Sequence, residues 1–510
     1  MKVEKRYLSL PLTAQLEITD FCNHRCIHCY NLDSAMENRP VRKVSDETVL
    51  ACAQKLIDNQ IFSVIVTGGE PLIKKELTKK VIRLLKENKT RVSLNSNLTL
   101  ADDDFIHFLK EQQVGVLTSC PSGDTDSFSR LTGTNNYPLF EATIKKLVSA
   151  GVRFTVNMVV TKVNLHEIRA TAEKMKILGC KSFAATPMGL NVEYPRLDLL
   201  LTVEEVRNVI ADLLWIEKHL KMKVDILEAL PKCVFPESVL KGKHAFLNRK
   251  CQAGRTVIAV SCNGDVRSCA HNPYSYGNLL EEELRDIWQK MSDWRSLQYI
   301  PEECTDCTWL NRCNGGCRTS AKVYNGDWNK KDMWCRGKLT DSPANDNINI
   351  ELKPDMLLKL TGNIRMRRED EDAFLIYNAE DDVFCMINKI FYDFIQQLKE
   401  NPICSFAKIC QKVGLPSNDI SIQDTVSFLL RKKILKIKKN SSMDTTKKAK
   451  ELVVYDYGNL TTQNTAKDNC FSCEADPCVC DCDCDCNCNN CDCDICDTNG
   501  CDTCDFYEEQ

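Results

Sequence analysis

Three cysteines near the start of the chain have a spacing that suits metal chemistry. Cys22, Cys26 and Cys29 form a C-x3-C-x2-C pattern. A structural zinc site needs a fourth ligand of comparable spacing, and His24 and His28 lie between the cysteines, where they could reach the same ion only by distorting the loop. Three thiolates suit a [4Fe–4S] cube instead, because they bind three irons and leave the fourth iron open for a substrate. We therefore expect an iron–sulfur site with one free coordination position.

A second motif, Gly68-Gly69-Glu70-Pro71, follows an apolar run further along the chain. Two glycines allow a backbone to approach a ligand closely, and a carboxylate is a partner for an ammonium group. These residues suit the binding of a small charged ligand. Hydrogen-bonding side chains that fit either ligand contacts or ordinary turns stand at the ends of two later runs: Ser96, Asn97 and Ser119.

A second field of cysteines lies in a loop-rich region with little periodicity. Its pattern includes C-x12-G-x4-C and C-x2-C-x5-C-x3-C, and spacing of this kind indicates metal binding in place of regular core packing. A pair of zinc sites is the alternative to iron–sulfur clusters, and iron content distinguishes them. Eight cysteines make up the field: Cys251, Cys262, Cys269, Cys304, Cys307, Cys313, Cys317 and Cys335.

The elements that position the first motifs are predicted from hydrophobic periodicity. Apolar runs alternate with amphipathic helical stretches between residues 14 and 220, and Ser45, Asn164 and Thr202 are expected helix N-caps. Such alternation predicts an α/β fold with a parallel sheet whose ligands bind at the carboxyl ends of the strands. The predicted strands are 15–19, 63–67, 91–95, 114–119, 153–160 and 182–187.

On Cys22, Cys26, Cys29 and the Gly68–Pro71 motif, the chain resembles the radical S-adenosylmethionine (SAM) superfamily. The resemblance implies a partial (β/α)6 barrel over residues 1–232, with His28 standing where the family has an aromatic residue. It also implies that residues 68–71 meet the amino group of SAM and that the three polar strand-end residues contact its ribose and carboxylate. The family's cluster reduces SAM, which yields a 5′-deoxyadenosyl radical that abstracts hydrogen from a substrate.

The second field resembles the SPASM extension of peptide-modifying radical enzymes, and a loop-rich SPASM domain is expected over residues 233–345. The resemblance implies two auxiliary [4Fe–4S] clusters, three clusters in all. One would be held by Cys304, Cys307, Cys313 and Cys335. The other would be held by Cys251, Cys269 and Cys317, with Cys262 either a fourth ligand or a plain strand thiol.

The sequence pattern of residues 351–439 predicts a small α+β, winged-helix-like domain. The predicted strands are 363–367, 373–377 and 383–387, and the predicted helices are 389–400, 405–412 and 423–431. The domain resembles the RiPP recognition element, which binds the leader segments of ribosomal peptides as an added strand. A structural or DNA-binding winged helix is the alternative.

Residues 440–510 combine a basic linker with an acidic tail. From Cys470 onward the chain has thirteen cysteines and twelve acidic residues but no Lys or Arg, and this composition predicts disorder without metal or crosslinks. Three interpretations stand: a soft-metal binder, an inert extension, or a Cys-rich peptide substrate fused in cis, whose tethering raises its effective concentration to about millimolar.

The whole chain of 510 residues carries a net charge of −4 and no apolar stretch of membrane-spanning length. We therefore expect a cytoplasmic protein without nucleic-acid or membrane partners. The resemblance to radical SAM enzymes also implies a reducing electron donor such as a flavodoxin or ferredoxin. The expected function is a radical SAM peptide maturase that forms thioether links in a Cys-rich ribosomal peptide, supplied in trans or by its own tail. The alternatives are a sulfatase maturase, which has Asp where this chain has Ala270, and a metal-binding or redox-sensing iron–sulfur protein.

Overall fold

The computed structural model describes residues 8–31, 44–296, 298–341, 352–381 and 383–438, and these residues belong to one compact unit, Met1–Leu460. The Cys-rich tail, residues 470–510, and the basic linker lie outside the described residues. Within the described part of the chain, no helix combines the length and the apolar composition that crossing a bilayer requires.

Six parallel strands in sequential order form the first part of the sheet, which confirms the predicted α/β fold. The first strand begins and ends two residues earlier than predicted, while the second and the sixth have the predicted bounds. The strands are β1 Thr13–Glu17, β2 Ser63–Thr67, β3 Arg91–Ser96, β4 Gly115–Ser119, β5 Phe154–Val160 and β6 Ser182–Pro187.

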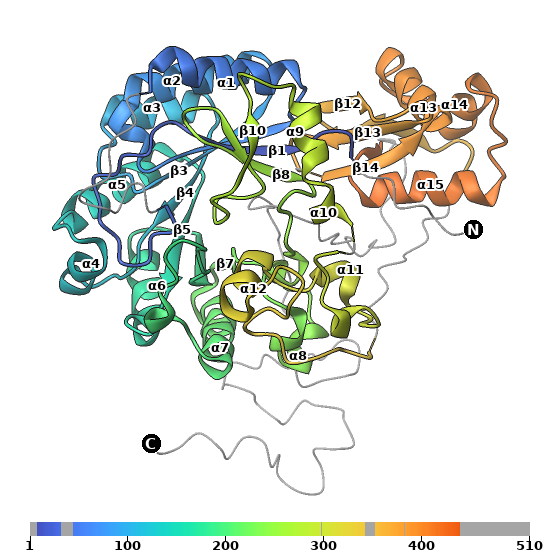
Figure 1. Cartoon of the computed structure of the whole chain (residues 1–510). Helices are drawn as coiled ribbons and strands as arrows, with labels where there is room; N and C mark the ends of the chain where they lie inside the picture. The colour runs from blue at the N-terminus through green and yellow to red at the C-terminus, as the bar shows by residue number, and fades with distance from the viewer. Residues whose placement is uncertain (1–7, 32–43, 297, 342–351, 382, 439–510) are drawn as a thin grey trace, which may run out of the picture. The chain divides into compact units, whose positions relative to one another are not determined.

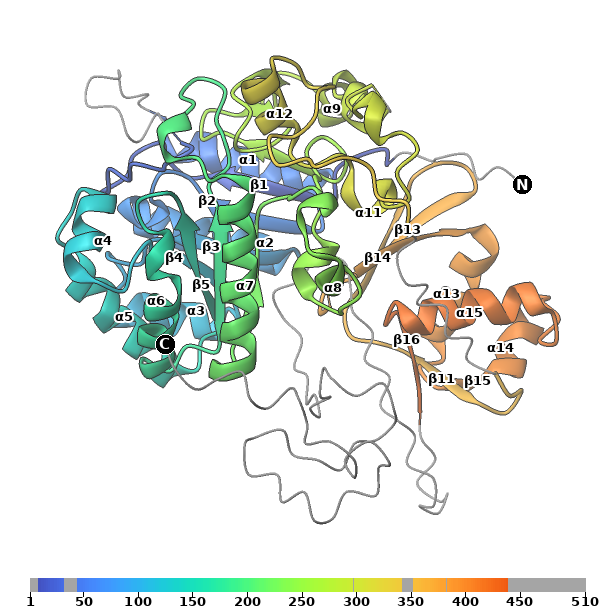
Figure 2. The ribbon, with the colours of Figure 1, turned by 90° about the horizontal axis from the view of Figure 1, so that it is seen from below.

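Helices connect these strands and lie along the outer side of the curved sheet, as Figures 1 and 2 show. Ser45 accepts from the Thr48 amide, and Thr202 forms a capping box with Glu205, as predicted. Asn164 stands at the N-cap of a 3₁₀ helix, Leu165–Glu167, as predicted, but its buried side chain makes no capping bond and donates to the carbonyls of Pro121 and Val159 instead. The helices are α1 Asp46–Asp58, α2 Lys75–Glu87, α3 Asp103–Glu111, α4 Thr125–Thr132, α5 Tyr137–Ala150, α6 Ile168–Ile177 and α7 Val203–Leu220.

Four short strands, none of them predicted, extend this sheet at both edges. β7 (Lys223–Asp225) pairs in parallel with β6, and β8 (Val257–Val260) pairs in parallel with β1. β9 (Asp265–Arg267) and β10 (Ser275–Asn278) continue from β8 as antiparallel neighbours. The second cysteine region is therefore joined to the barrel through backbone hydrogen bonds on β1, the strand that precedes Cys22.

The rest of the second cysteine region consists of short helices and turns, as the lack of periodicity predicts. Its apolar side chains, among them Trp288, Trp294 and Trp334, belong to the same buried core as the barrel. The helices are α8 Glu237–Leu240, α9 Leu284–Lys290, α10 Ser292–Arg295, α11 Leu310–Cys313 and α12 Arg318–Asn325.

Residues 352–438, here called the C-terminal domain, contain the predicted strands and helices together with a second sheet that was not predicted. The central sheet has the order β12-β13-β14, and the second has the order β15-β11-β16. Strands of two to four residues give no periodic signal, which explains why the second sheet was missed. The elements are β11 Leu357–Leu360, β12 Ile364–Arg368, β13 Ala373–Asn378, β14 Val383–Asn388, α13 Lys389–Glu400, β15 Cys404–Ser405, α14 Phe406–Lys412, α15 Ile420–Arg431 and β16 Leu435–Ile437.

The C-terminal domain contacts the amino-terminal ends of the barrel strands. Tyr377 of β13 stacks on Phe62, which immediately precedes β2, with ring centroids 5.0 Å apart. The buried guanidinium of Arg367 donates to the carbonyls of Leu10 and Pro11, shortly before β1, and pairs with Glu369 at 2.7 Å. Because both anchor points precede their strands, the domain lies at the end of the barrel away from the Cys22 loop.

Candidate functional site

The loop that carries Cys22, Cys26 and Cys29 follows β1 and is held in place from one side by helix α4. The amide of Arg25 donates to the carbonyl of Thr132 at 2.7 Å, and the amide of Ile27 donates to that of Leu131 at 3.0 Å. Within the loop, the amide of His24 donates to the Cys22 sulfur at 3.4 Å. The two backbone bonds to α4 hold the loop without using the thiols as structural links.

The Gly68–Pro71 turn holds the same loop from the other side. The amide of Gly69 donates to the Thr19 carbonyl at 2.7 Å, and the amide of Glu70 donates to the Phe21 carbonyl at 2.6 Å. A Cβ atom on Gly68 would lie 2.4 Å from the Thr19 oxygen, and one on Gly69 would lie 2.1 Å from the Phe21 oxygen. The close approach that requires both glycines is therefore the one between this turn and the cysteine loop.

Glu70 is buried and ties the ends of β2 and β3 together. Its Oε1 accepts from the Leu72 amide at 2.9 Å and from the Ser96 hydroxyl at 2.7 Å, and its Oε2 accepts from the Asn97 amide at 2.7 Å. Burial raises its pKa to about 7, although these three donors oppose the shift. These bonds use three of the carboxylate's roughly four acceptor sites, so Oε2 retains acceptor capacity for an ammonium donor.

The predicted cofactor contacts at the later strand ends have different surroundings. Ser96 and Asn97 are buried, and the Asn97 amide group donates to the Asn23 side chain in the cysteine loop at 2.8 Å. Ser119 is exposed at the end of β4. The structure thus joins Ser96 and Asn97 to the Cys22 loop and leaves Ser119 apart from that network.

The thiols of the Cys22 loop have raised pKa values, as expected for a site that a positively charged group completes. Burial raises the pKa of Cys22 to about 12 and that of Cys26 well above its ordinary value. Nε2 of His24 and Nδ1 of His28 are buried without a hydrogen-bond partner, and burial lowers the pKa of each ring to about 4. Protonated thiols and unpartnered ring nitrogens around one loop fit an iron–sulfur group, whose binding would release the thiol protons.

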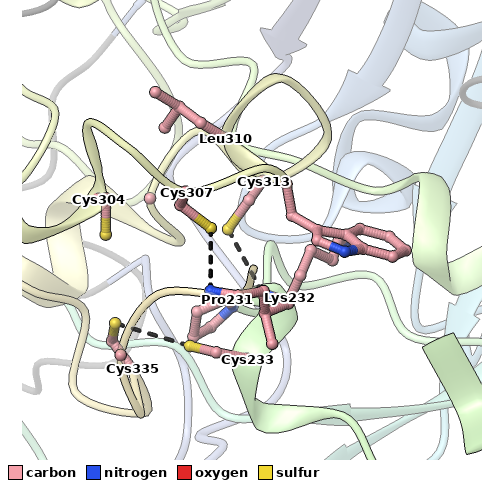
Figure 3. Close-up of a pocket in the computed structure, with 12 residues that line it drawn as sticks. Pro231, Lys232, Cys233, Cys304, Cys307, Leu310, Cys313 and Cys335 are labelled. Carbon is pink, nitrogen blue, oxygen red and sulfur yellow. Dashed lines mark hydrogen bonds between the residues drawn. The ribbon is translucent and has the colours of Figure 1, made fainter. Parts of the chain in front are cut away.

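Four cysteines of the second field line one pocket, together with a fifth that the sequence did not indicate. Cys304, Cys307, Cys313 and Cys335 are the four predicted to act together, and the fifth is Cys233 (Figure 3). Cys233 was missed because no neighbouring cysteine gives it a recognisable spacing, so the fold alone brings it to the pocket.

The other predicted ligand set is brought together only in part. Burial raises the pKa of Cys269 to about 11, and the nearby Cys251 adds to that shift. For Cys317, burial followed by the charges of Glu228 and Cys251 raises the pKa well above its usual range. Cys262, the possible fourth ligand, lies two residues after the end of β8 and is packed in the apolar core.

The two thiol fields adjoin each other through an aromatic contact. Tyr30 directly follows Cys29, and its ring lies 4.7 Å, centroid to centroid, from that of His271, two residues after Cys269. The buried carboxylate of Glu17, at the end of β1, pairs with Arg267 of β9 beside this contact. Within the described ranges, no group of three or more His, Cys, Asp or Glu side chains is arranged to hold a single metal ion. The ligands of a [4Fe–4S] cube need not converge on one ion, because the cube takes one thiolate on each iron and its ligands are spread around it.

Two family models match this chain in the regions just described. Residues 16–175 match the radical SAM superfamily, and residues 251–308 match SPASM, an iron–sulfur cluster-binding domain. The chain contains a radical SAM domain followed by a SPASM domain. It is accordingly an enzyme of radical redox chemistry that binds SAM and iron–sulfur clusters. Cys313, Cys317 and Cys335 lie beyond the matched part of the SPASM domain.

Relatives of this radical SAM protein have several activities. The antilisterial bacteriocin subtilosin biosynthesis protein AlbA of Bacillus subtilis is 29% identical over 325 residues, covering 60% of this chain and 67% of its own. The AdoMet-dependent heme synthase of Methanosarcina barkeri is 26% identical over 345 residues, covering 62% and 94%. The crystal structure of Streptococcus suis SuiB bound to its precursor peptide SuiA has a TM-score of 0.51 at 17% identity, covering 65% and 77%, and supports the fold.

Proposed function

We propose that this radical SAM SPASM protein is a peptide maturase that forms thioether links in a Cys-rich ribosomal peptide. The observation that carries the proposal is the Tyr30–His271 contact, since it joins the loop of the first three thiols to a second thiol field. An auxiliary cluster beside the radical site suits a reaction that removes more than one electron. AlbA acts in bacteriocin biosynthesis and SuiB binds a precursor peptide, which supports a peptide substrate.

The chain's own residues would hold three [4Fe–4S] clusters. Cys22, Cys26 and Cys29 would bind the first, and the Gly68–Pro71 turn with Glu70 would orient SAM beside it. When bound, SAM and the clusters supply one-electron chemistry that removes two hydrogens from the peptide for each C–S bond formed. The auxiliary ligand sets would be Cys304, Cys307, Cys313 and Cys335 for one cluster, and Cys251, Cys269 and Cys317 for the other.

The C-terminal domain would hold the unmodified part of the peptide. In its central sheet, β12 and β14 each have one edge that pairs with no other described strand. One face of this sheet packs on the barrel through Leu375 and Tyr377, and the other packs on α13 through residues such as Phe374 and Ile376. Both faces being covered, an outer edge is where an extended peptide would add as a strand. The domain limits we propose are 1–232, 233–345 and 351–439.

The tail from Cys470 to Gln510 is the substrate we propose first, acting in cis. Its cysteines alternate with Asp and Asn, and tethering would supply it at about millimolar effective concentration. A separate Cys-rich peptide would serve in trans through the same domain. A flavodoxin or ferredoxin would supply the reducing electron.

Mass spectrometry of the full chain tests this proposal. Anoxically reconstituted protein is incubated with dithionite, with and without SAM, and the tail is then released by proteolysis. We expect the tail to lose two hydrogens per link only when SAM is present, and a chain with Ala at Cys22, Cys26 and Cys29 should leave it unchanged. An unchanged tail in protein that still releases 5′-deoxyadenosine would contradict the cis substrate.

A reaction on a tetrapyrrole is the second candidate, because the heme synthase relative is matched over nearly its whole length. It predicts that an iron porphyrin, and not a peptide, is consumed in step with 5′-deoxyadenosine release. Failure to cleave SAM despite a reducible first cluster would favour a redox-sensing protein.

A further inference from the structure

Cys233 lies in the pocket of the second thiol field but belongs to neither predicted ligand set. It comes from a short 3₁₀ helix, Lys232–Val234, between the barrel and the predicted SPASM ligands. Figure 3 shows it facing Cys335 across the pocket that Cys304, Cys307 and Cys313 also line. The pocket therefore contains five thiols, whereas a [4Fe–4S] cube takes one thiolate on each of its four irons.

The five thiols approach the pocket from three segments. Cys304, Cys307 and Cys313 come from one stretch of ten residues, while Cys233 and Cys335 come from separate segments. The sulfurs of Cys233 and Cys335 are 3.7 Å apart and in hydrogen-bond contact. Cys335 also bonds to Cys304, whose place in the C-x2-C-x5-C run gives it an iron of its own. Terminal ligands on neighbouring irons point away from one another along the corners of the cube, so Cys233, the fifth thiol, is placed to reach the corner of Cys335, the sulfur it contacts.

Backbone amides around the pocket favour thiolates at Cys233 and Cys313. The amide of Arg336, which follows Cys335, donates to the Cys233 sulfur at 3.1 Å. The amide of Lys232, which precedes Cys233, donates to the Cys313 sulfur at 3.3 Å. The segments that carry Cys233 and Cys335 thus each place an amide donor on a sulfur of the pocket, and hydrogen bonds to ligand sulfurs help to set the properties of such clusters.

We propose that Cys233 and Cys335 are interchangeable ligands of one iron in the cluster of this pocket, an inference that rests on the auxiliary cluster proposed above. Exchange breaks one iron–sulfur bond and forms another at the same iron. The incoming thiol gives its proton to the outgoing thiolate, so no electron leaves the site. The unbound partner remains as a free thiol beside the cluster.

Iron content tests the exchange in full-length protein that already carries Ala at Cys22, Cys26 and Cys29, so that only auxiliary iron is counted. We expect Cys233→Ala and Cys335→Ala each to keep the iron and sulfide of this background. The double variant should lose about four irons per chain, the content of one cube. Loss of iron in either single variant, or none in the double variant, would overturn the interchange.

Cys313→Ala separates this inference from the cluster on which it depends. If Cys313→Ala and Cys335→Ala each lose about four irons per chain, the pocket binds a cluster but Cys233 does not replace Cys335 as a ligand. If Cys313→Ala retains all of its iron, no cluster is bound in this pocket and the inference fails.

Alkylation of Cys233 and Cys335 in the unmutated protein tests the exchange without relying on the folding of variants. Both Cys233 and Cys335 are partly exposed, whereas Cys304 and Cys313 are buried. Under anoxia, we expect iodoacetamide to label the first two partially and at mutual expense, with both fully labelled after the iron is chelated. Complete protection of Cys335 with complete labelling of Cys233 would contradict the exchange.

Discussion

The hydroxyl of Ser96 donates to the carboxylate of Glu70 across 2.7 Å, so the ends of β3 and β2 are tied by two side chains that the sequence predicts as cofactor contacts. The same carboxylate accepts from the Asn97 amide, and Asn97 in turn reaches the cysteine loop through Asn23. The first thiol site is thus built on a hydrogen-bond network within the protein. A defect in that network should act on the cluster loop as well as on SAM.

Glu70→Gln should destabilise this network. Its side-chain nitrogen would face either the Asn97 amide or the Leu72 amide, two donors against one another, and a buried mismatch of this kind costs about 1–3 kcal/mol. We expect a lower melting temperature and weaker SAM binding, measured by thermal unfolding and equilibrium dialysis. Glu87→Gln, an exposed carboxylate on α2, is the matched control and should change neither.

Gly69→Ala should displace the cysteine loop, because the added Cβ would lie 2.1 Å from the Phe21 carbonyl oxygen. Its reconstituted iron content should fall by about four per chain, the content of the first cube. Gly115→Ala, in β4 of the same sheet, has no atom within 4 Å of the new Cβ and should bind iron like the parent. Equal iron in both variants would show that the turn and the loop do not need this close contact.

Substitution of Cys22, Cys26 and Cys29 by Ala should stop SAM cleavage. With the open-iron cluster absent, release of 5′-deoxyadenosine under reducing conditions should fall to the level without enzyme, followed by chromatography of the quenched reaction. Cys180→Ala removes a buried barrel thiol and should keep both the iron and the cleavage rate. If the triple variant cleaved SAM as fast as the parent, another site would have to carry the chemistry.

Arg367→Ala should loosen the C-terminal domain from the barrel. The change leaves the buried Glu369 carboxylate without its cation and removes two bonds to the carbonyls before β1, a loss of about 3–5 kcal/mol. Hydrogen exchange in β12 and β13, followed by mass spectrometry, should become faster. Arg368→Ala changes an exposed neighbour on the same strand and should leave the exchange unaltered.

The sequence predicts the six barrel strands well because each is a run of β-branched and apolar residues followed by a turn. It also predicts α13 at its observed bounds, since Asn388 is a good N-cap and the apolar positions recur at helical spacing. The local sequence pattern is sufficient to predict these strands and this helix. The strands β7 to β10, by contrast, have three or four residues each, too few for a periodic signal, and β8 joins the sheet by pairing with β1, far away in the chain.

The candidate site shows the same division. Cys22, Cys26 and Cys29 are close in sequence, so their spacing alone indicates their joint role. Cys233 reaches its pocket through the path of the chain, and Ser96 and Asn97 are satisfied by Glu70, which is 26 and 27 residues away. Contacts between residues far apart in the chain depend on tertiary structure and leave no local signature.

Attachment of the C-terminal domain before β1 and β2 sets a minimum spacer in any peptide that it holds. The cysteine loop and the Gly68–Pro71 turn follow the opposite ends of those strands, which are five residues long. A bound segment and a modified cysteine must therefore be separated by roughly 17 Å, or about five extended residues, at the very least. In a chain that modifies its own tail, residues 439–469 are several times longer than this distance requires.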